Sequence, residues 1–318
     1  MSILCAGIGL ELGGAVFGSS RPAATSTAAP TNVDTSPLPT VGSTPSTGTP
    51  SSTDAIAAMV DPAIVDITTM LDGGQAAGTG MVLTPGGLVL TNNHVIADAT
   101  DIHVQINGAG QAYSATVLGY DISDDVALLQ IEGVSNLATI TVGDSSTVAV
   151  RDHVIALGNA LGRGGTPAVA EGLVTALNKS IAAGDVVGGP RQTLSDLIEI
   201  SAPLVPGDSG GPLVNTNGQV IGMNAAASQR GGGRPVNDAF AIPINKALDI
   251  AHQIQAGQSS AKVHIGARAL LGVQVHDANG AAIASVQSGS PADGAGMEAG
   301  DVIVSVGDTA IASVSRPP

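Results

Sequence analysis

Cysteine and aromatic residues are scarce in this chain of 318 residues. It has a single cysteine, Cys5, no tryptophan, and two residues each of tyrosine and phenylalanine. One cysteine excludes an intrachain disulfide framework. A hydrophobic core must therefore be filled by valine, isoleucine, leucine and alanine. Hydrophobic residues make up 43% of the chain, which is sufficient for a folded domain and excludes wholesale disorder.

Basic residues are also few. Lysine and arginine total 11 against 26 acidic residues, which gives a formal net charge of −15. No stretch forms a basic patch that could neutralise phosphate groups, so we expect no nucleic-acid partner. We also expect no metal site, because metal-ligand spacing is missing from all six histidines: His94, His103, His153, His252, His264 and His276.

The N-terminal region lacks the features of a complete membrane signal. Residues 1–18 are largely apolar, but they are too short for a comfortable membrane span and have no basic region of the kind that starts an export signal. They are either the remnant of an anchor or signal, which would allow a membrane tether, or a loose apolar terminus. Residues 19–55 are rich in serine, threonine and proline, which predicts a flexible linker.

Glycine, in contrast, is abundant at 43 residues, and short apolar runs recur between turn residues over 56–258. This pattern favours an all-β barrel or sandwich. One helix is predicted over 245–255, with Gly257 as its stop. A second β-rich unit spans 266–318, and its small size indicates a partial domain. We expect strands over 63–68, 79–83, 88–91, 102–106, 115–118, 126–131, 154–157, 172–177, 198–200, 212–214 and 220–223.

The strongest chemical signal is the motif Gly207-Asp208-Ser209-Gly210-Gly211. A serine hydroxyl becomes an effective nucleophile only when a base takes its proton and donors stabilise the developing oxyanion. We predict Ser209 as the nucleophile and Gly207, Asp208 and Ser209 as the oxyanion hole, with the amides of Gly207 and Ser209 as its donors. Taken alone, the motif is also compatible with an ordinary glycine-rich turn.

The base and the orienting acid are predicted to be His94 and Asp125. His94 follows a short predicted strand, and Asp125 directly precedes an apolar one; Asp121 and Asp124 are rival acids. The separations are 31 residues (125 − 94) and 84 residues (209 − 125). The chain order His, Asp, Ser is that of the chymotrypsin fold, in which two barrels contribute to one cleft.

Several stretches then resemble, in the correct order, the HtrA/Deg family of trypsin-like serine proteases with a PDZ domain, of the actinobacterial type. The resemblance implies a mainly β structure, a chymotrypsin-like double six-stranded β-barrel followed by a truncated PDZ domain. The family mostly has asparagine before the serine, where this chain has Asp208; we expect activity to survive because that residue contributes mainly backbone. The matching stretches are 78–83, 90–96, 125–130, 156–159, 172–177, 206–215, 218–224, 240–243, 289–292 and 299–303.

The resemblance also implies the function. It implies an endopeptidase for unfolded or damaged proteins in cell-envelope quality control, membrane-anchored or secreted, without a cofactor and assembled as a homotrimer. A proteolytically inactive peptide-binding or chaperone module on the same fold is the alternative, and an esterase or acyltransferase on the same triad is a third.

By the same resemblance, two further sets of residues bind peptides. A small neutral pocket for the substrate side chain has Pro203 at its base, which favours cleavage after valine, alanine or leucine. Its other residues are Leu204, Asn224, Ala225 and Ala226. A loop that would bind the C-terminal carboxylate of a peptide at the PDZ domain contains Arg268, Leu270, Leu271, Gly272 and Val273.

Overall fold

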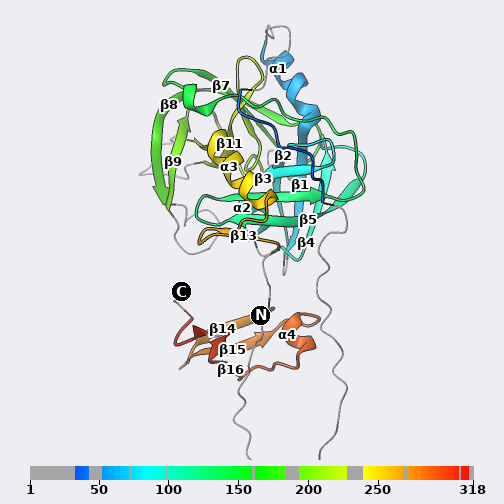
Figure 1. The fold of residues 1–318 in the computed structure, drawn as a ribbon, viewed down its shortest axis with the longest axis vertical. Helices are drawn as coiled ribbons and strands as arrows, with labels where there is room; N and C mark the ends of the chain where they lie inside the picture. Colours follow the sequence, from blue (N-terminus) through cyan, green and yellow to red (C-terminus); the bar gives the residue numbers. More distant parts are fainter. Residues whose placement is uncertain are drawn as a thin grey trace, which may run out of the picture. The chain divides into compact units, whose positions relative to one another are not determined.

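The structure is a computed structural model. Residues 28–267 form one unit and residues 268–318 belong to a second (Figure 1). In the part of the chain that the structure describes, no helix has the length and hydropathy that a membrane span requires. The described residues are 33–42, 52–71, 74–97, 99–159, 162–182, 193–227, 239–267, 271–278, 280–307 and 309–314.

Six antiparallel strands of the larger unit close into a first barrel. They pair in the order β5-β4-β1-β2-β3-β6, and β5 also pairs with β6, which completes the ring. A further short strand, β13 (Val263–Ile265), pairs with the last three residues of β5. The six strands are β1 (Ile64–Leu71), β2 (Gly74–Val82), β3 (Leu88–Thr91), β4 (Asp101–Ile106), β5 (Ala112–Asp121) and β6 (Val126–Ile131).

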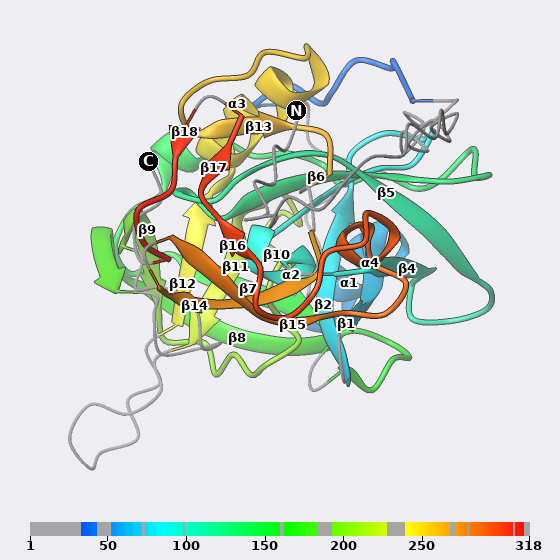
Figure 2. The same cartoon turned by 90° about the horizontal axis from the view of Figure 1, so that it is seen from below.

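A second closed barrel has the strand order β10-β11-β12-β9-β8-β7 and is drawn in green to yellow in Figure 2. The double barrel is therefore confirmed. Two of its strands, β8 and β9, are longer than predicted, because they stay paired as far as Ala182 and Thr193. Leu194 and Leu197 of the added part of β9 are buried in a hydrophobic cluster, and Lys179 forms a 2.8 Å ion pair with Glu199. The strands are β7 (His153–Gly158), β8 (Ala168–Ala182), β9 (Thr193–Ile200), β10 (Pro212–Asn215), β11 (Val220–Ala227) and β12 (Ala239–Pro243).

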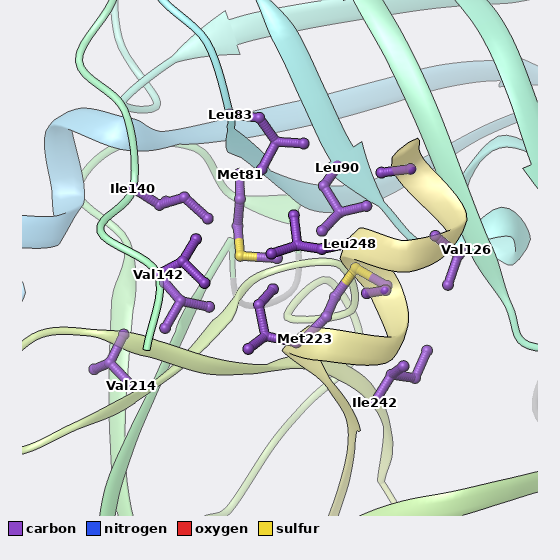
Figure 3. Packing of buried hydrophobic residues seen from close by; sticks show 14 of the residues in the cluster. Met81, Leu83, Leu90, Val126, Ile140, Val142, Val214, Met223, Ile242 and Leu248 are labelled. Atoms are coloured by element: carbon purple, nitrogen blue, oxygen red, sulfur yellow. The ribbon is translucent and has the colours of Figure 1, made fainter. Parts of the chain in front are cut away.

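The largest hydrophobic cluster joins the two barrels. It contains buried side chains of both barrels and of the predicted helix, α3 (Ile244–Gln255), which ends as expected at Gly257 with φ 66°. Figure 3 shows Met81 of the first barrel, Met223 of the second and Leu248 of α3 in this cluster. This shared core fixes the position of one barrel relative to the other, as a cleft with residues from both requires.

One helix was not predicted. Thr53–Val60 forms α1, capped by Ser52, whose hydroxyl accepts the amide of Ala55. Ile56, Ala57 and Val60 bury its apolar face in the shared core. Its Ser/Thr/Ala-rich start resembles the preceding linker, which is why composition concealed it. The remaining helical turns in this unit are η1 (Asp61–Ala63), α2 (Asn93–Ile96) and η2 (Ser145–Thr147).

The flexible linker predicted over 19–55 is wrong for residues 33–42, which make fixed contacts with the first barrel. The amide of Asp34 donates to Gln130 Oε1 at 2.7 Å, and Thr84 donates to the Asp34 carboxylate. Leu38 is 4% exposed and belongs to the shared core. One buried leucine among polar residues is sufficient to hold this segment, although the average composition is that of a linker.

Replacement of Leu38 by alanine should therefore lower the free energy of unfolding by about 2–4 kcal/mol, because it leaves a cavity in the shared core. Val41 lies in the same segment but is 41% exposed. Val41→Ala is the matched control and should change the free energy by less than about 0.5 kcal/mol. Urea denaturation measures both. Equal effects would contradict the burial of this segment in solution.

The smaller unit is a three-stranded sheet, β14-β15-β16, with one helical turn and a two-stranded hairpin. Ser290 caps the turn by accepting the amide of Asp293. Its core is small and is formed mainly by Ala281, Ile283, Ala292, Met297 and Ile303. The elements are β14 (Val273–Asp277), β15 (Ala281–Val286), α4 (Pro291–Gly294), β16 (Val302–Ile303), β17 (Ser305–Val306) and β18 (Thr309–Ala310).

Candidate active site

His94 and Asp125 are in direct contact in the first barrel. His94 lies in α2, directly after β3, and its Nδ1 is 2.7 Å from Asp125 Oδ2. The backbone amide of His94 donates to the other carboxylate oxygen at 2.9 Å. The carboxylate is therefore held by both the ring and the backbone of one residue. Nε2 remains as the ring nitrogen that can exchange a proton with a nucleophile.

Asp125 is placed by an unusual backbone conformation. Its φ is 55°, in the left-handed region, and it is buried. Asn92, which is fully buried, donates from Nδ2 to the Asp125 carbonyl oxygen at 2.9 Å. Sequence reasoning missed Asn92; the signal was a polar residue between an apolar strand and the candidate histidine.

The rival acids have other partners. Asp121 Oδ1 accepts the Ser123 hydroxyl at 2.7 Å and the Asp124 amide at 3.0 Å. Asp124 forms ion pairs with Lys246 and Lys262. Of the three acids that the sequence left open, the structure places only Asp125 against His94.

The charge of Asp125 also changes the proton affinity of His94. Burial works against a charged imidazole. The nearby Asp125 carboxylate outweighs this through its charge and its hydrogen bond, and the pKa of His94 rises above its ordinary value of 6.5. This environment favours a ring that accepts a proton and keeps it while an adjacent group reacts.

Ser209 lies in the turn between β9 and β10 and is half-buried. Its hydroxyl donates to the carbonyl oxygen of Ala225 on β11 at 3.3 Å. Within the described residues it makes no hydrogen bond with His94. The contact between nucleophile and base therefore stays a prediction, and it requires the hydroxyl to exchange its acceptor.

The backbone before Ser209 forms a tight turn. The amide of Asp208 donates to the Val205 carbonyl at 3.1 Å, and Gly207, after Pro206, has φ 102°, which fits a type II turn. The Asp208 carboxylate accepts the Val205 amide at 2.9 Å. Asp208 was expected within the oxyanion hole, but its amide is already used in the turn. The amides of Gly207 and Ser209 have no protein acceptor among the described residues.

Thr79 of β2 holds this turn against the first barrel. Its amide donates to the Ser209 carbonyl at 2.8 Å, and its hydroxyl donates to the Gly207 carbonyl at 2.6 Å. The same hydroxyl oxygen accepts the Asn159 amide at 2.8 Å. Thr79 was not predicted as a site residue, although it stands between two glycines in one of the matching stretches. Through it, the two barrels fix the nucleophile turn together.

The predicted pocket wall is corrected at Asn224. This side chain is 0% exposed, and its Nδ2 donates to the carbonyl oxygens of Leu157 and Pro212 at 3.1 and 3.3 Å. Its own carbonyl accepts the amide of Gly210 at 2.8 Å. Because these contacts turn it into the barrel, Asn224 braces the nucleophile turn and does not line a wall.

The other predicted pocket residues stay predictions. Pro203 is exposed and Leu204 packs on the core of the second barrel. Ala225 is buried and supplies the carbonyl oxygen that Ser209 contacts. The side chain of Ala226 lies outside the described residues.

In the predicted carboxylate-binding loop, Arg268 and Leu270 lie outside the described residues. The carbonyl oxygens of Leu271 and Gly272 accept the amides of Ala292 and Gln287 at 3.0 and 2.9 Å. Val273 begins β14. The loop is therefore hydrogen-bonded to α4 and to the residues that precede α4. Whether the loop binds a carboxylate stays a prediction.

Comparisons with known proteins agree on the family. Residues 78–223 match the trypsin-like peptidase domain model, and residues 269–316 match the PDZ domain model. A solved HtrA-type protease, AlgW with a tripeptide, is 30% identical with a TM-score of 0.55 and covers 79% of this chain and 81% of its own.

Two curated relatives are similar over most of this chain. The serine protease PepD of Mycobacterium tuberculosis is 35% identical over 282 residues, which is 83% of this chain and 59% of PepD. A probable periplasmic serine endoprotease DegP-like of Pseudomonas putida is 35% identical over 257 residues, which is 76% of this chain and 50% of that protein. The chain thus spans between one half and three fifths of the length of these relatives.

Proposed function

We propose, from the premise that this chain belongs to the HtrA family of trypsin-like serine proteases with a PDZ domain, that it is a serine endopeptidase. His94, Asp125 and Ser209 would be its catalytic residues. The contact of 2.7 Å between His94 Nδ1 and Asp125 Oδ2 is the observation that carries the proposal. Through this contact Asp125 orients His94 as a base and raises its pKa. The first barrel, which carries both residues, also holds the glycine-rich turn of Ser209 through Thr79.

The proposed mechanism begins when the Ser209 hydroxyl leaves the Ala225 carbonyl and donates to His94 Nε2. The imidazole takes the proton as Oγ forms a bond to the substrate carbonyl carbon, and Asp125 stabilises the imidazolium. The amides of Gly207 and Ser209 donate to the oxyanion. His94 then gives the proton to the leaving amine, and a water molecule repeats the sequence on the acyl-enzyme.

The alternative is a peptide-binding or chaperone module without proteolysis, and the hydrogen bond of Ser209 to Ala225 is the observation that favours it. Incubation with casein and with an organophosphate separates the two functions. An active enzyme degrades casein and is labelled at Ser209, and Ser209→Ala shows neither result. The alternative gives no labelling of the wild type.

The substrates and setting are inferred from the family. We infer that the protein acts on unfolded or damaged proteins in the cell envelope, because the Pseudomonas relatives are named periplasmic endoproteases. We also infer a homotrimer, and a membrane tether or secretion through the N-terminal region. An apolar side-chain pocket would make cleavage broad; mass spectrometry of casein fragments should show valine, alanine or leucine before the cut.

The pH dependence of this activity follows from His94. The base must be neutral, and Asp125 raises its pKa above 6.5, so kcat/KM should increase with pH through an inflection above 6.5. Asp125→Asn removes the charge that raises the pKa, so the inflection should move down while kcat falls by about 10⁴-fold. A profile with its maximum near pH 4 would instead indicate carboxylate chemistry.

Peptide binding at the PDZ domain should depend on the free carboxylate. A loop of backbone amides recognises the charge of a peptide C-terminus while the peptide adds a strand to the sheet. We expect isothermal calorimetry to show binding of an apolar peptide acid at least about tenfold tighter than binding of its amide. Equal affinities would rule out a carboxylate loop over 268–273.

A further inference from the structure

Residues 260–266, near the C-terminal end of the larger unit, contact both ends of the turn that carries Asp125. This turn runs from Asp121 to Asp125 between β5 and β6, and Asp125 has a left-handed φ of 55°. A non-glycine residue keeps such a conformation only where its surroundings determine it. The hydrogen bonds to His94 and Asn92 hold Asp125 itself. Within the turn, the Asp121 carboxylate accepts the Ser123 hydroxyl and the Asp124 amide, so the position of the turn as a whole depends on what holds Asp121 and Asp124.

Asp124, the residue before the catalytic acid, is held by two lysines from the C-terminal end of the unit. Its Oδ1 is 2.6 Å from Lys246 Nζ on α3, and its Oδ2 is 3.1 Å from Lys262 Nζ. The Asp124 side chain is 11% exposed. A carboxylate this buried is strongly disfavoured when its partners are removed. Lys246 also donates to the Ser195 carbonyl on β9 at 3.2 Å, which extends the contact to the second barrel.

The other end of the turn is paired with β13. Val263 pairs with Asp121, and His264 pairs with Tyr120, on which its ring stacks at 5.1 Å between centroids. The amide of Gly266 donates to the Leu118 carbonyl at 2.7 Å. Residues 260–266 therefore hold the start of the turn through backbone pairing and its end through Lys262. The same segment precedes the second unit, which begins at residue 268.

We propose that Asp124, Lys246 and Lys262 are positioning residues for the catalytic acid, and that residues 260–266 set the position of Asp125 against His94. The proposal rests on the proposed function. Movement of this segment would pull the turn at Asp121 and at Asp124 together. The contact of 2.7 Å between Asp125 and His94 would then lengthen, and His94 would lose the partner that orients its ring.

The direction in which the pKa of His94 changes separates a positioning role of the lysines from a direct effect of their charge on the ring. The charged groups that face Asp124 are Lys246 and Lys262, with Asp121 in the same turn and Asp196 at 3.9 Å from Lys246. Removal of a lysine charge by itself favours the imidazolium and raises the pKa of His94. A looser Asp125 contact lowers the same pKa. The two effects have opposite signs.

The decisive variant is Lys262→Gln, because this side chain is 61% exposed and its loss should leave the fold intact. We expect kcat to fall by about tenfold with KM unchanged, and the inflection of the pH profile to move down. Lys262→Arg keeps the charge and should restore both values. Lys179→Gln removes a lysine ion pair with Glu199 elsewhere and should change neither.

A second measurement does not depend on activity. The pKa of the His94 ring, followed by NMR titration of the full chain, should fall in Lys262→Gln. An unchanged or higher pKa in Lys262→Gln would overturn the proposal. If the wild type hydrolyses nothing and resists organophosphate, the proposed function fails, whereas the NMR titration still decides whether the segment positions Asp125.

Discussion

Replacement of Ser209 by alanine is expected to reduce hydrolysis of casein by about 10⁴–10⁶-fold, because no other group in the proposed mechanism forms the acyl-enzyme. The fold should survive. Ser209 is half-buried, and its hydroxyl makes one long hydrogen bond of 3.3 Å to Ala225. We expect the free energy of unfolding to change by less than about 0.5 kcal/mol. Initial rates and urea denaturation on the same preparations measure the two effects.

The double variant of Ser209 and His94 provides the sharper test. Nucleophile and base act as a unit, so His94→Ala should cost nearly as much as Ser209→Ala, and the double variant should cost little more than either. If the loss of activity in the double variant equals the product of the two single losses, the two residues act independently, contrary to a triad. Proteolysis that survives in Ser209→Ala would remove the serine mechanism.

The barrels were predictable because their signals are local, and so are the motifs from which the triad is proposed. Alternating apolar runs fix strands within a few residues, and the motif around Ser209 and the turn before β6 each occupy one short stretch. The choice of Asp125 over Asp124 was not local. It depends on Lys246 and Lys262, which lie more than a hundred positions further along the chain and occupy the rival carboxylate.

Thr79 was missed, and Asn224 was predicted with a different role, for the same physical reason. Thr79 donates to the carbonyl of Gly207, 128 positions away, and Asn224 donates to Leu157, 67 positions away. A threonine in a strand and an asparagine beside an apolar run have no local sign of these contacts. The side chain of Asp208 was also underestimated, because its carboxylate accepts the Val205 amide and so helps to hold the turn.

The second large effect is expected from a substitution at Gly210, which follows Ser209 and lies close to Thr79. Its φ is 86°, and a Cβ there would lie 2.0 Å from the Thr79 carbonyl oxygen and 2.3 Å from Thr91 Oγ1. A backbone oxygen in a paired strand cannot move aside without breaking the contacts that hold Ser209. Gly110 provides a matched control, since its φ is 79° and nothing lies within 4 Å of the position that a Cβ would occupy there.

Both substitutions to alanine carry the same left-handed backbone strain, so the difference between them measures the clash alone. Gly110→Ala should lower the free energy of unfolding by about 1–2 kcal/mol. Gly210→Ala should cost about 3 kcal/mol more, and the folded fraction should lose at least about 100-fold in kcat because the turn is displaced. Urea denaturation gives the first quantity, and rates normalised to organophosphate-reactive sites give the second. Equal losses of stability would show that the two barrels do not meet at Gly210 and Thr79 as closely as the structure has them.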